Sequence, residues 1–276
     1  MRKLIALCCL LLTVCHLKAQ VKKHNVLTFD SLNFAAIKKQ LNAIDATPFE
    51  KLDFESNGEK MRYRLLKPKN VLSTVKYPLV IALHNSSRIG TDNELQLEPL
   101  TRIWLKNDLR ERYPAFVLAP QFAERPTIYS ENDSSKILTA TAQPNLQLLV
   151  KLISQIIENP QIDKNRIYLI GYSMGGSTAQ HLLSQDPNLF AAMVAVAGVP
   201  NFSNIQQISK KPIWLIHGLK DNENPFVGSE KLFELLNGNN KLRFTIYDNL
   251  DHNNINSAIL ATDDLAKWLF QWKNNK

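Results

Sequence analysis

An apolar run in this 276-residue chain leads directly into a glycine-rich turn and a helix, and this pattern restricts the possible folds strongly. Residues 167–170 are followed by Gly171-Tyr-Ser-Met-Gly175-Gly176, and helical spacing of apolar residues continues to Ser184. So tight a turn strains the residue at its tip and needs neighbours without side chains, which the glycines supply. The pattern predicts that Ser173 projects from the end of a strand at the N-terminus of a helix.

Short apolar runs alternate with longer helical segments along most of the chain. This alternation is typical of an α/β fold with a mostly parallel central sheet and helices on both faces. An amphipathic hairpin at the sheet edge is predicted at 51–56 and 60–66, and strands buried on both faces are predicted at 79–83, 115–119, 167–170, 192–197 and 213–216, with a last strand at 243–247. Helices are predicted at 95–112, 145–158, 174–184, 229–236 and 258–273.

Residues 1–19 have the layout of a cleavable secretory signal peptide. A basic start precedes an apolar run from Leu4 to Val14, and Ala19 stands at the predicted cleavage site. The alternative is a lipoprotein signal with Cys15 as the acylated residue. The apolar run is shorter than the roughly 20 residues that span a bilayer. We therefore expect a secreted or periplasmic protein with no stable membrane span.

The rest of the chain divides into two predicted parts. Residues 20–48 are interpreted as an N-terminal extension with a helix from about Ser31 to Ile44, capped by Asp30 or Ser31. Residues 49–276 carry the strand-helix alternation and form the predicted main domain. All three cysteines lie in the leader, so we expect no disulfide and no cysteine metal site in the mature protein.

The basic charge of the chain does not indicate a nucleic-acid partner. The formal charge of +8 falls to +5 without the three basic residues of the leader, and the remaining lysines are scattered. No basic run is interleaved with aromatic residues, as a nucleic-acid surface would require. The charge is therefore interpreted as a solvated surface, and the sequence gives no indication of an oligomeric state.

Ser173 needs a base, because a serine hydroxyl is a weak nucleophile near neutral pH. His252 follows the last predicted strand, in a loop that can swing over the strand ends. His217 is expected to brace its own loop, and His181 lies about two turns along the helix from Ser173, roughly 12 Å by the rise per residue. We therefore predict His252 as the base.

The base in turn needs an acid that orients its ring. Asp221, Asp248 and Asp251 all follow Ser173 in the chain. Asp248 and Asp251 are too close to His252 along the chain to reach back onto its ring easily, whereas Asp221 follows a separate strand. Asp221 is therefore the leading candidate. The backbone N–H of Met174 is a candidate donor to an oxyanion, with a second donor expected from the loop that begins at His84.

With these residues in view, the segment from about Met61 to Leu269 resembles secreted α/β-hydrolase esterases of the feruloyl esterase, acetyl-xylan esterase and polyhydroxybutyrate-depolymerase-like group. The resemblance rests on Pro78-Leu-Val-Ile-Ala-Leu-His84, Gly90-Thr-Asp-Asn-Glu94, Leu118-Ala-Pro-Gln121, Arg166-Ile-Tyr-Leu-Ile-Gly-Tyr-Ser-Met-Gly-Gly176, Pro212-Ile-Trp-Leu-Ile-His-Gly218 with Asp221, and Asp251-His252.

The resemblance implies a catalytic triad of Ser173, Asp221 and His252, and an oxyanion loop at residues 84–87 in which Ser86 N–H is the second donor. The sequence departs from the family where Asn85 replaces glycine and where Ser87 replaces a small flexible residue. Asparagine tolerates left-handed backbone angles, so the loop is still expected to turn. Residues 253–257 also lack the aromatic that often follows the family's histidine.

The leading hypothesis is therefore a secreted serine carboxylic-ester hydrolase that acts through an acyl-enzyme without a cofactor. Its expected substrate is a small-molecule or polysaccharide ester, and the segment 122–143 with Tyr129 is the predicted substrate loop. A small serine peptidase similar to the prolyl-oligopeptidase group is the first alternative. A non-catalytic binding protein derived from a hydrolase is the second, motivated by Asn85 and by the missing aromatic.

Overall fold

The computed structural model describes residues 21–27 and 31–274, and the side chains of residues 31–33 are left out of the description. The predicted signal peptide at 1–19, with the alternative lipid site Cys15, lies outside these residues. The predicted helix cap Asp30 lies outside them too. In the described part of the chain, no helix is long and apolar enough to cross a membrane.

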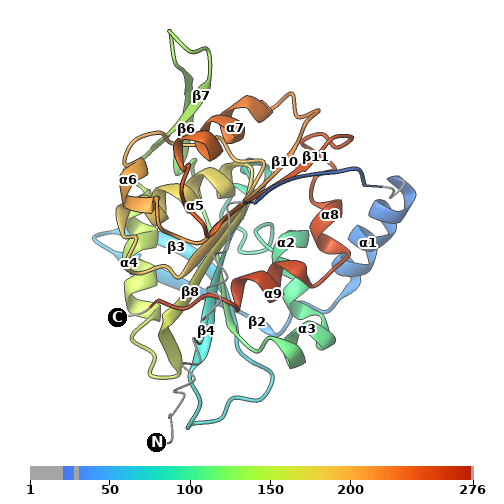
Figure 1. The fold of residues 1–276 in the computed structure, drawn as a ribbon. Coiled ribbons are helices and arrows are strands. Elements are labelled where there is room, and N and C mark those ends of the chain that lie inside the picture. Colours follow the sequence, from blue (N-terminus) through green and yellow to red (C-terminus); the bar gives the residue numbers. More distant parts are fainter. Residues whose placement is uncertain (1–20, 28–30, 275–276) are drawn as a thin grey trace, which may run out of the picture.

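A nine-stranded sheet runs through the centre of the described molecule, with its strands in the order β1-β11-β10-β9-β8-β4-β5-β3-β2 (Figure 1). Neighbours from β1 to β5 in this order are parallel, whereas β3 is antiparallel to both β5 and β2. The strands are β1 Val21–Asn25, β2 Phe49–Ser56, β3 Glu59–Leu66, β4 Tyr77–Leu83, β5 Phe116–Gln121, β8 Ile162–Tyr172, β9 Ala192–Val196, β10 Ile213–Gly218 and β11 Leu242–Tyr247. The predicted edge hairpin and mostly parallel sheet are confirmed.

Helices cover both faces of this sheet and bury one hydrophobic core on each (Figure 1). One face carries α4 Leu146–Ile156, α5 Met174–Gln185, α6 Ile205–Ile208 and α7 Phe226–Leu235. The other carries α1 Ser31–Ala43, α2 Pro99–Arg102, α3 Asn107–Arg112, α8 Ser257–Leu260 and α9 Asp264–Leu269, with the short 3-10 turn η2 Ile103–Leu105. The central strands contact helices on both faces, which explains why their sequences are almost continuously apolar.

The segment predicted as an N-terminal extension, residues 20–48, contributes to this architecture directly. β1 pairs in parallel with β11, from Val21 opposite Arg243 to Asn25 opposite Tyr247. Helix α1 packs against α2 and α8, and its Leu41 is buried. The strand therefore extends the central sheet, while the division of the chain at residue 48 stays a prediction.

Two long helices predicted from sequence periodicity are interrupted in the structure. The predicted helix at 95–112 is α2, η2 and α3. Pro99 begins α2, because proline cannot continue a helix that starts at residue 95. Lys106 has extended backbone, with φ −60° and ψ 128°, and separates η2 from α3. The predicted helix at 258–273 is α8 and α9. Asp263 is the residue just before α9 and accepts hydrogen bonds from Arg112 and Tyr113, so tertiary contacts stabilise this break.

The segment 122–143, predicted as a substrate loop, contains a separate two-stranded hairpin. Strands β6 Thr127–Glu131 and β7 Leu138–Ala142 pair antiparallel and project from the body of the molecule (Figure 1). Tyr129 leans back onto α5, where its hydroxyl lies 3.0 Å from Ser177 Oγ. Sequence reasoning missed this hairpin because the strands are short and partly exposed.

The turn between β8 and α5 depends on close backbone contacts that exclude side chains. A Cβ on Gly171 would lie 2.2 Å from the carbonyl of Gly175, and a Cβ on Gly175 would lie 2.0 Å from Leu83 O. Both distances are far below van der Waals contact. The glycines therefore let α5 sit directly against the ends of β8 and β4.

We expect Gly175→Ala to destabilise the protein by about 3 kcal/mol or more, because backbone atoms that cannot rotate away must shift to admit the methyl group. Gly58→Ala is the matched control, since a Cβ there meets nothing within 4 Å and only its φ of +80° is unfavourable. That control should cost about 1–2 kcal/mol. Urea unfolding of both variants measures the difference, and equal midpoints would contradict the role given to the contact with Leu83.

Candidate active site

Ser173 occupies the tip of the turn between β8 and α5, as the sequence predicts. Its backbone has φ 55° and ψ −119°, a conformation that is costly for a residue with a side chain. Its N–H donates to Val196 O of the neighbouring strand over 2.8 Å, which fixes this conformation. Such retained strain points to a functional position.

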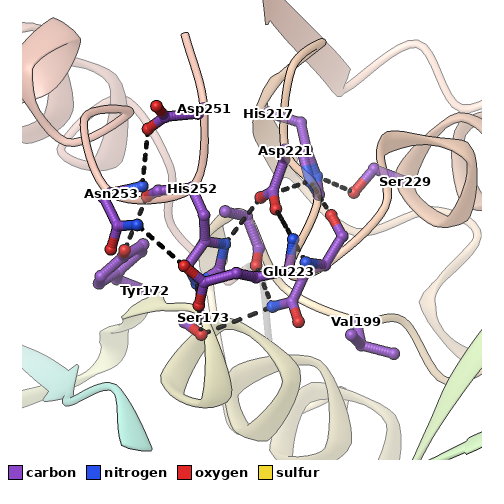
Figure 2. Close-up of polar contacts among 12 residues, drawn as sticks. Tyr172, Ser173, Val199, His217, Asp221, Glu223, Ser229, Asp251, His252 and Asn253 are labelled. Atoms are coloured by element: carbon purple, nitrogen blue, oxygen red, sulfur yellow. Dashed lines mark hydrogen bonds and ion pairs between the residues drawn. The ribbon is translucent and has the colours of Figure 1, made fainter. Parts of the chain in front are cut away.

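His252 and Asp221 lie in line with Ser173 (Figure 2). His252 Nε2 is 3.0 Å from Ser173 Oγ, and His252 Nδ1 is 2.7 Å from Asp221 Oδ2. All three side chains are at least nine-tenths buried. Ser173 follows β8, Asp221 follows β10 and His252 follows β11, and the carboxyl ends of parallel strands meet at one edge of a sheet. The structure thus brings together three residues that are far apart in the sequence.

Asp221 is held as a carboxylate by the groups around it. Burial opposes ionisation, but hydrogen bonds from His217, from His252 and from the backbone N–H of Asn224 outweigh it, so the pKa of Asp221 lies well below its usual range. Oδ1 accepts from the N–H groups of Glu223 and Asn224 over 3.0 and 2.8 Å. Oδ2 therefore remains for the histidine rings.

The other histidines and acids considered from the sequence do not contact Ser173. His217 lies behind Asp221, where its Nδ1 is 2.7 Å from Ser229 Oγ and its Nε2 is 2.8 Å from Asn224 O. His181 Nε2 faces Ala140 O over 3.2 Å. Asp248 Oδ1 instead contacts His24 on the surface, and Asp251 Oδ1 accepts from the N–H groups of Asn253 and Asn254.

The loop after β4 lies beside Ser173. Ser86 lines the same cavity of about 270 Å³ as Ser173 and His252. Met174 begins α5, and among the described residues neither its N–H nor that of Ser86 donates a hydrogen bond. Ser87 N–H, in contrast, is occupied by Asn85 Oδ1 over 2.8 Å. The two predicted donors thus stay unengaged next to the serine.

Asn85 adopts φ −76° and ψ 171°, which is ordinary extended backbone. The left-handed conformation that would favour glycine is therefore not used here, and the loop turns without it. The side chain caps the short 3-10 turn η1 Ser86–Arg88 instead. His84 holds the loop from the other side, since its Nδ1 donates to Asn85 O over 2.7 Å and its Nε2 accepts from Phe122 N–H over 3.0 Å.

Sequence reasoning missed three polar residues around the site. Asn224 donates through Nδ2 to Ala197 O over 2.7 Å and reaches Ser173 Oγ at 3.5 Å. Tyr172 donates its hydroxyl to His252 O over 2.7 Å and so holds the loop that carries the imidazole. Glu98 lines the cavity although it is almost fully buried. Tyr172 lies two residues after the predicted strand at 167–170 and Asn224 lies three residues after Asp221, and these positions were the available signal. Nothing local distinguished Glu98.

The cavity is lined by residues of α1 and α2, of the turn η1, of the end of β8 and of the loops after β10 and β11. Among the described residues, its lining includes none from 122 to 143, so the predicted substrate loop does not form this wall. Within the same part of the chain, no group of three or more histidines, cysteines or acids could hold a metal ion.

The chain was compared with curated proteins by sequence. An acetylxylan esterase A from Emericella nidulans is 24% identical over 184 residues, which is 65% of this chain and 57% of that protein. A bifunctional acetylxylan esterase/xylanase from Neocallimastix patriciarum is 35% identical over 75 residues, 27% of this chain and 11% of that protein. The chain therefore spans less than two thirds of either relative's length.

Solved structures were compared by fold. A thermostable esterase is 29% identical with a TM-score of 0.72, over 82% of this chain and 63% of that one. A ferulic acid esterase from Anaeromyces mucronatus has a TM-score of 0.59 at 18% identity, over 80% and 88% of the two chains. An acylaminoacyl peptidase from Pyrococcus horikoshii has a TM-score of 0.59 at 15% identity, over 83% and 42%. At these lower identities the likeness is one of fold.

The family comparison covers just over half of the chain, since the model of the phospholipase/carboxylesterase family matches residues 128–267. This match runs from the β6–β7 hairpin through α5 to α9 and includes Ser173, Asp221 and His252. Together with the sheet order and the helical layers, it establishes that the chain has the α/β-hydrolase fold and belongs to the phospholipase/carboxylesterase family, a family of carboxylic-ester hydrolases.

Proposed function

We propose that this protein is a serine carboxylic-ester hydrolase with Ser173 as nucleophile, His252 as general base and Asp221 as the orienting acid. The observation that carries the proposal is the buried chain of contacts from Ser173 Oγ to His252 Nε2 at 3.0 Å and from His252 Nδ1 to Asp221 Oδ2 at 2.7 Å. A carboxylate can only accept a hydrogen bond, so Asp221 holds the imidazole proton on Nδ1. Nε2 is then free to accept the serine proton.

Acylation begins when Ser173 Oγ attacks the ester carbonyl carbon and its proton moves to His252 Nε2. The tetrahedral intermediate collapses as the bond to the alcohol oxygen breaks, and that oxygen takes the proton from Nε2. Water then attacks the acyl-enzyme with the same base, and its proton returns to Ser173 Oγ as the acid leaves. Asp221 stabilises the imidazolium in both halves without itself being protonated.

The backbone N–H groups of Met174 and Ser86 are the proposed donors to the oxyanion. Met174 lies at the N-terminus of α5, where the helix dipole adds partial positive charge. Ser86 lies in η1 and lines the same cavity as Ser173. Both groups are supported by their position and by being unengaged among the described residues.

The proposed substrates are acyl groups carried by polysaccharides or by small polar alcohols. The two relatives named as acetylxylan esterases support this class. The cavity also fits an alcohol that carries further hydroxyl groups, because its wall includes polar side chains of Lys38, Arg88 and Asn256. Cleavage of the signal peptide proposed at residues 1–19 would place the enzyme outside the cytoplasm, where such substrates occur.

We expect Ser173→Ala to lower kcat/KM for 4-nitrophenyl acetate by roughly 10⁶-fold, to the background of the assay. Ser184→Ala is the matched control, because it removes a buried hydroxyl from the same helix about three turns away. That control should keep the wild-type rate. A panel of acetyl, butyryl and feruloyl esters with a peptide anilide completes the test, and cleavage of the anilide without cleavage of any ester would contradict the proposal.

Asp221→Asn should lower kcat by about 10³–10⁴-fold. The new amide donates to His252 Nδ1 and thereby moves the imidazole proton to Nε2, where it blocks the base. Asp248→Asn serves as control, since this acid contacts His24 on the surface. Steady-state kinetics at neutral pH would measure both, and an active Asp221→Asn protein would exclude Asp221 as the orienting acid.

A further inference from the structure

Glu98 is a buried carboxyl group in the wall of the cavity that contains Ser173, and none of the proposed catalytic steps uses it. Only 4% of the residue is exposed. Its Oε2 accepts a hydrogen bond from Asn85 Nδ2, while its Oε1 has no partner among the described residues. A buried carboxyl with an unpaired oxygen destabilises a folded protein, so its presence beside a reactive serine calls for a functional explanation.

The Asn85 amide connects Glu98 to the loop after β4. Its Oδ1 accepts from Ser87 N–H at 2.8 Å and from Ser87 Oγ at 2.6 Å. A backbone N–H is an obligatory donor, so the amide oxygen must face Ser87 and the NH₂ group must face Glu98. Both ends of the amide are therefore occupied, and its orientation is fixed.

The backbone of Glu98 is fixed at the start of α2. Its carbonyl accepts from the N–H groups of Thr101 and Arg102, both at 2.9 Å, at the start of α2. Pro99, the first residue of this helix, restricts the backbone further. The Glu98 carboxyl group thus connects α2 to Asn85 through a hydrogen bond, and Asn85 lies in the loop that contains Ser86.

The pKa of Glu98 is raised, and this favours an uncharged carboxyl group next to the cavity. Burial raises its pKa to about 8, against the opposing effects of the Arg88 charge, the Asn85 hydrogen bonds and the Lys38 charge. The carboxyl is therefore mostly protonated at neutral pH. It can accept from Asn85 without placing a full negative charge beside an oxyanion on the substrate.

We propose that Glu98 is a positioning residue for ester hydrolysis, which holds Asn85 so that Ser86 N–H faces the substrate oxyanion. The inference rests on the proposed function and gives a role to Asn85, at the position where the resemblance to feruloyl and acetyl-xylan esterases implies glycine. The Asn85 side chain fixes the loop through its contacts with Ser87 and Glu98. Glu98 acts through Asn85 and does not touch the reacting atoms.

The test uses Asn85→Ala, Glu98→Leu, Glu98→Gln and the double variant Asn85→Ala/Glu98→Leu in the full chain. Asn85→Ala and Glu98→Leu each remove the contact between Asn85 and Glu98. Each should lower kcat for 4-nitrophenyl acetate by about 10- to 100-fold with little change in KM, because only the oxyanion geometry is lost. Glu98→Gln keeps an acceptor for Asn85 and should retain most of kcat. The double variant should be no slower than the slower single variant, because both act through one contact.

A trifluoromethyl ketone inhibitor reports the oxyanion geometry directly, since it forms a tetrahedral adduct on serine. Its Ki should rise by the same factor as kcat/KM falls across the variants. Asn239→Ala is the matched control: Asn239 is a buried asparagine whose Oδ1 likewise accepts the N–H two residues on, at 3.0 Å from Lys241, far from the cavity. It should lower the thermal midpoint without changing kcat or Ki.

Wild-type values of kcat and Ki in folded Asn85→Ala and Glu98→Leu would overturn the inference. It would also be overturned if the loss of kcat in the double variant equalled the product of the losses in the two single variants. If Glu98→Leu does not fold, Asn85→Ala and Glu98→Gln decide the question. These outcomes are distinct from failure of the proposed function, in which the wild-type rate would equal that of Ser173→Ala.

Discussion

The close approach of α5 to the ends of β8 and β4 is the constraint on which the site depends. It requires glycine at 171 and 175, because any Cβ there would overlap backbone atoms. The same contact forces Ser173 into a positive φ and sets the first turn of α5 against the loop that begins at His84. One packing contact thus holds Ser173 at the tip of the turn, in the wall of the cavity that Ser86 also lines.

Around this turn, buried polar groups hold each other in one orientation. Asp221 accepts from two histidines and two backbone N–H groups, and Tyr172 anchors the backbone of His252. Asn85 holds the loop after β4 through its hydrogen bonds with Ser87 and Glu98. Such networks are stabilising only when nearly every member is satisfied, so the unpaired oxygen of Glu98 stands out from its surroundings.

Much of the fold and the three proposed catalytic residues could be predicted from the sequence. Buried parallel strands are continuous apolar runs, and the glycines around Ser173 mark the strand-to-helix turn. Chain order then singles out Asp221 and His252, which the structure places in contact. The interrupted helices and the β6–β7 hairpin could not be predicted in this way. The break at Asp263, for example, is accompanied by a contact with Arg112 on another element. Periodicity does not record such contacts.

The amino-acid sequence alone predicts the alternation of strands and helices, the elbow at Ser173 and the proposed acid and base, because each has a local pattern or a fixed place in the chain. The position of β1 at the sheet edge and the contact between Glu98 and Asn85 arise only in the folded molecule. These pairings join residues from different elements, and nothing in the local sequence of either partner specifies the other. Their energetics depend on burial, which exists only once the chain has folded.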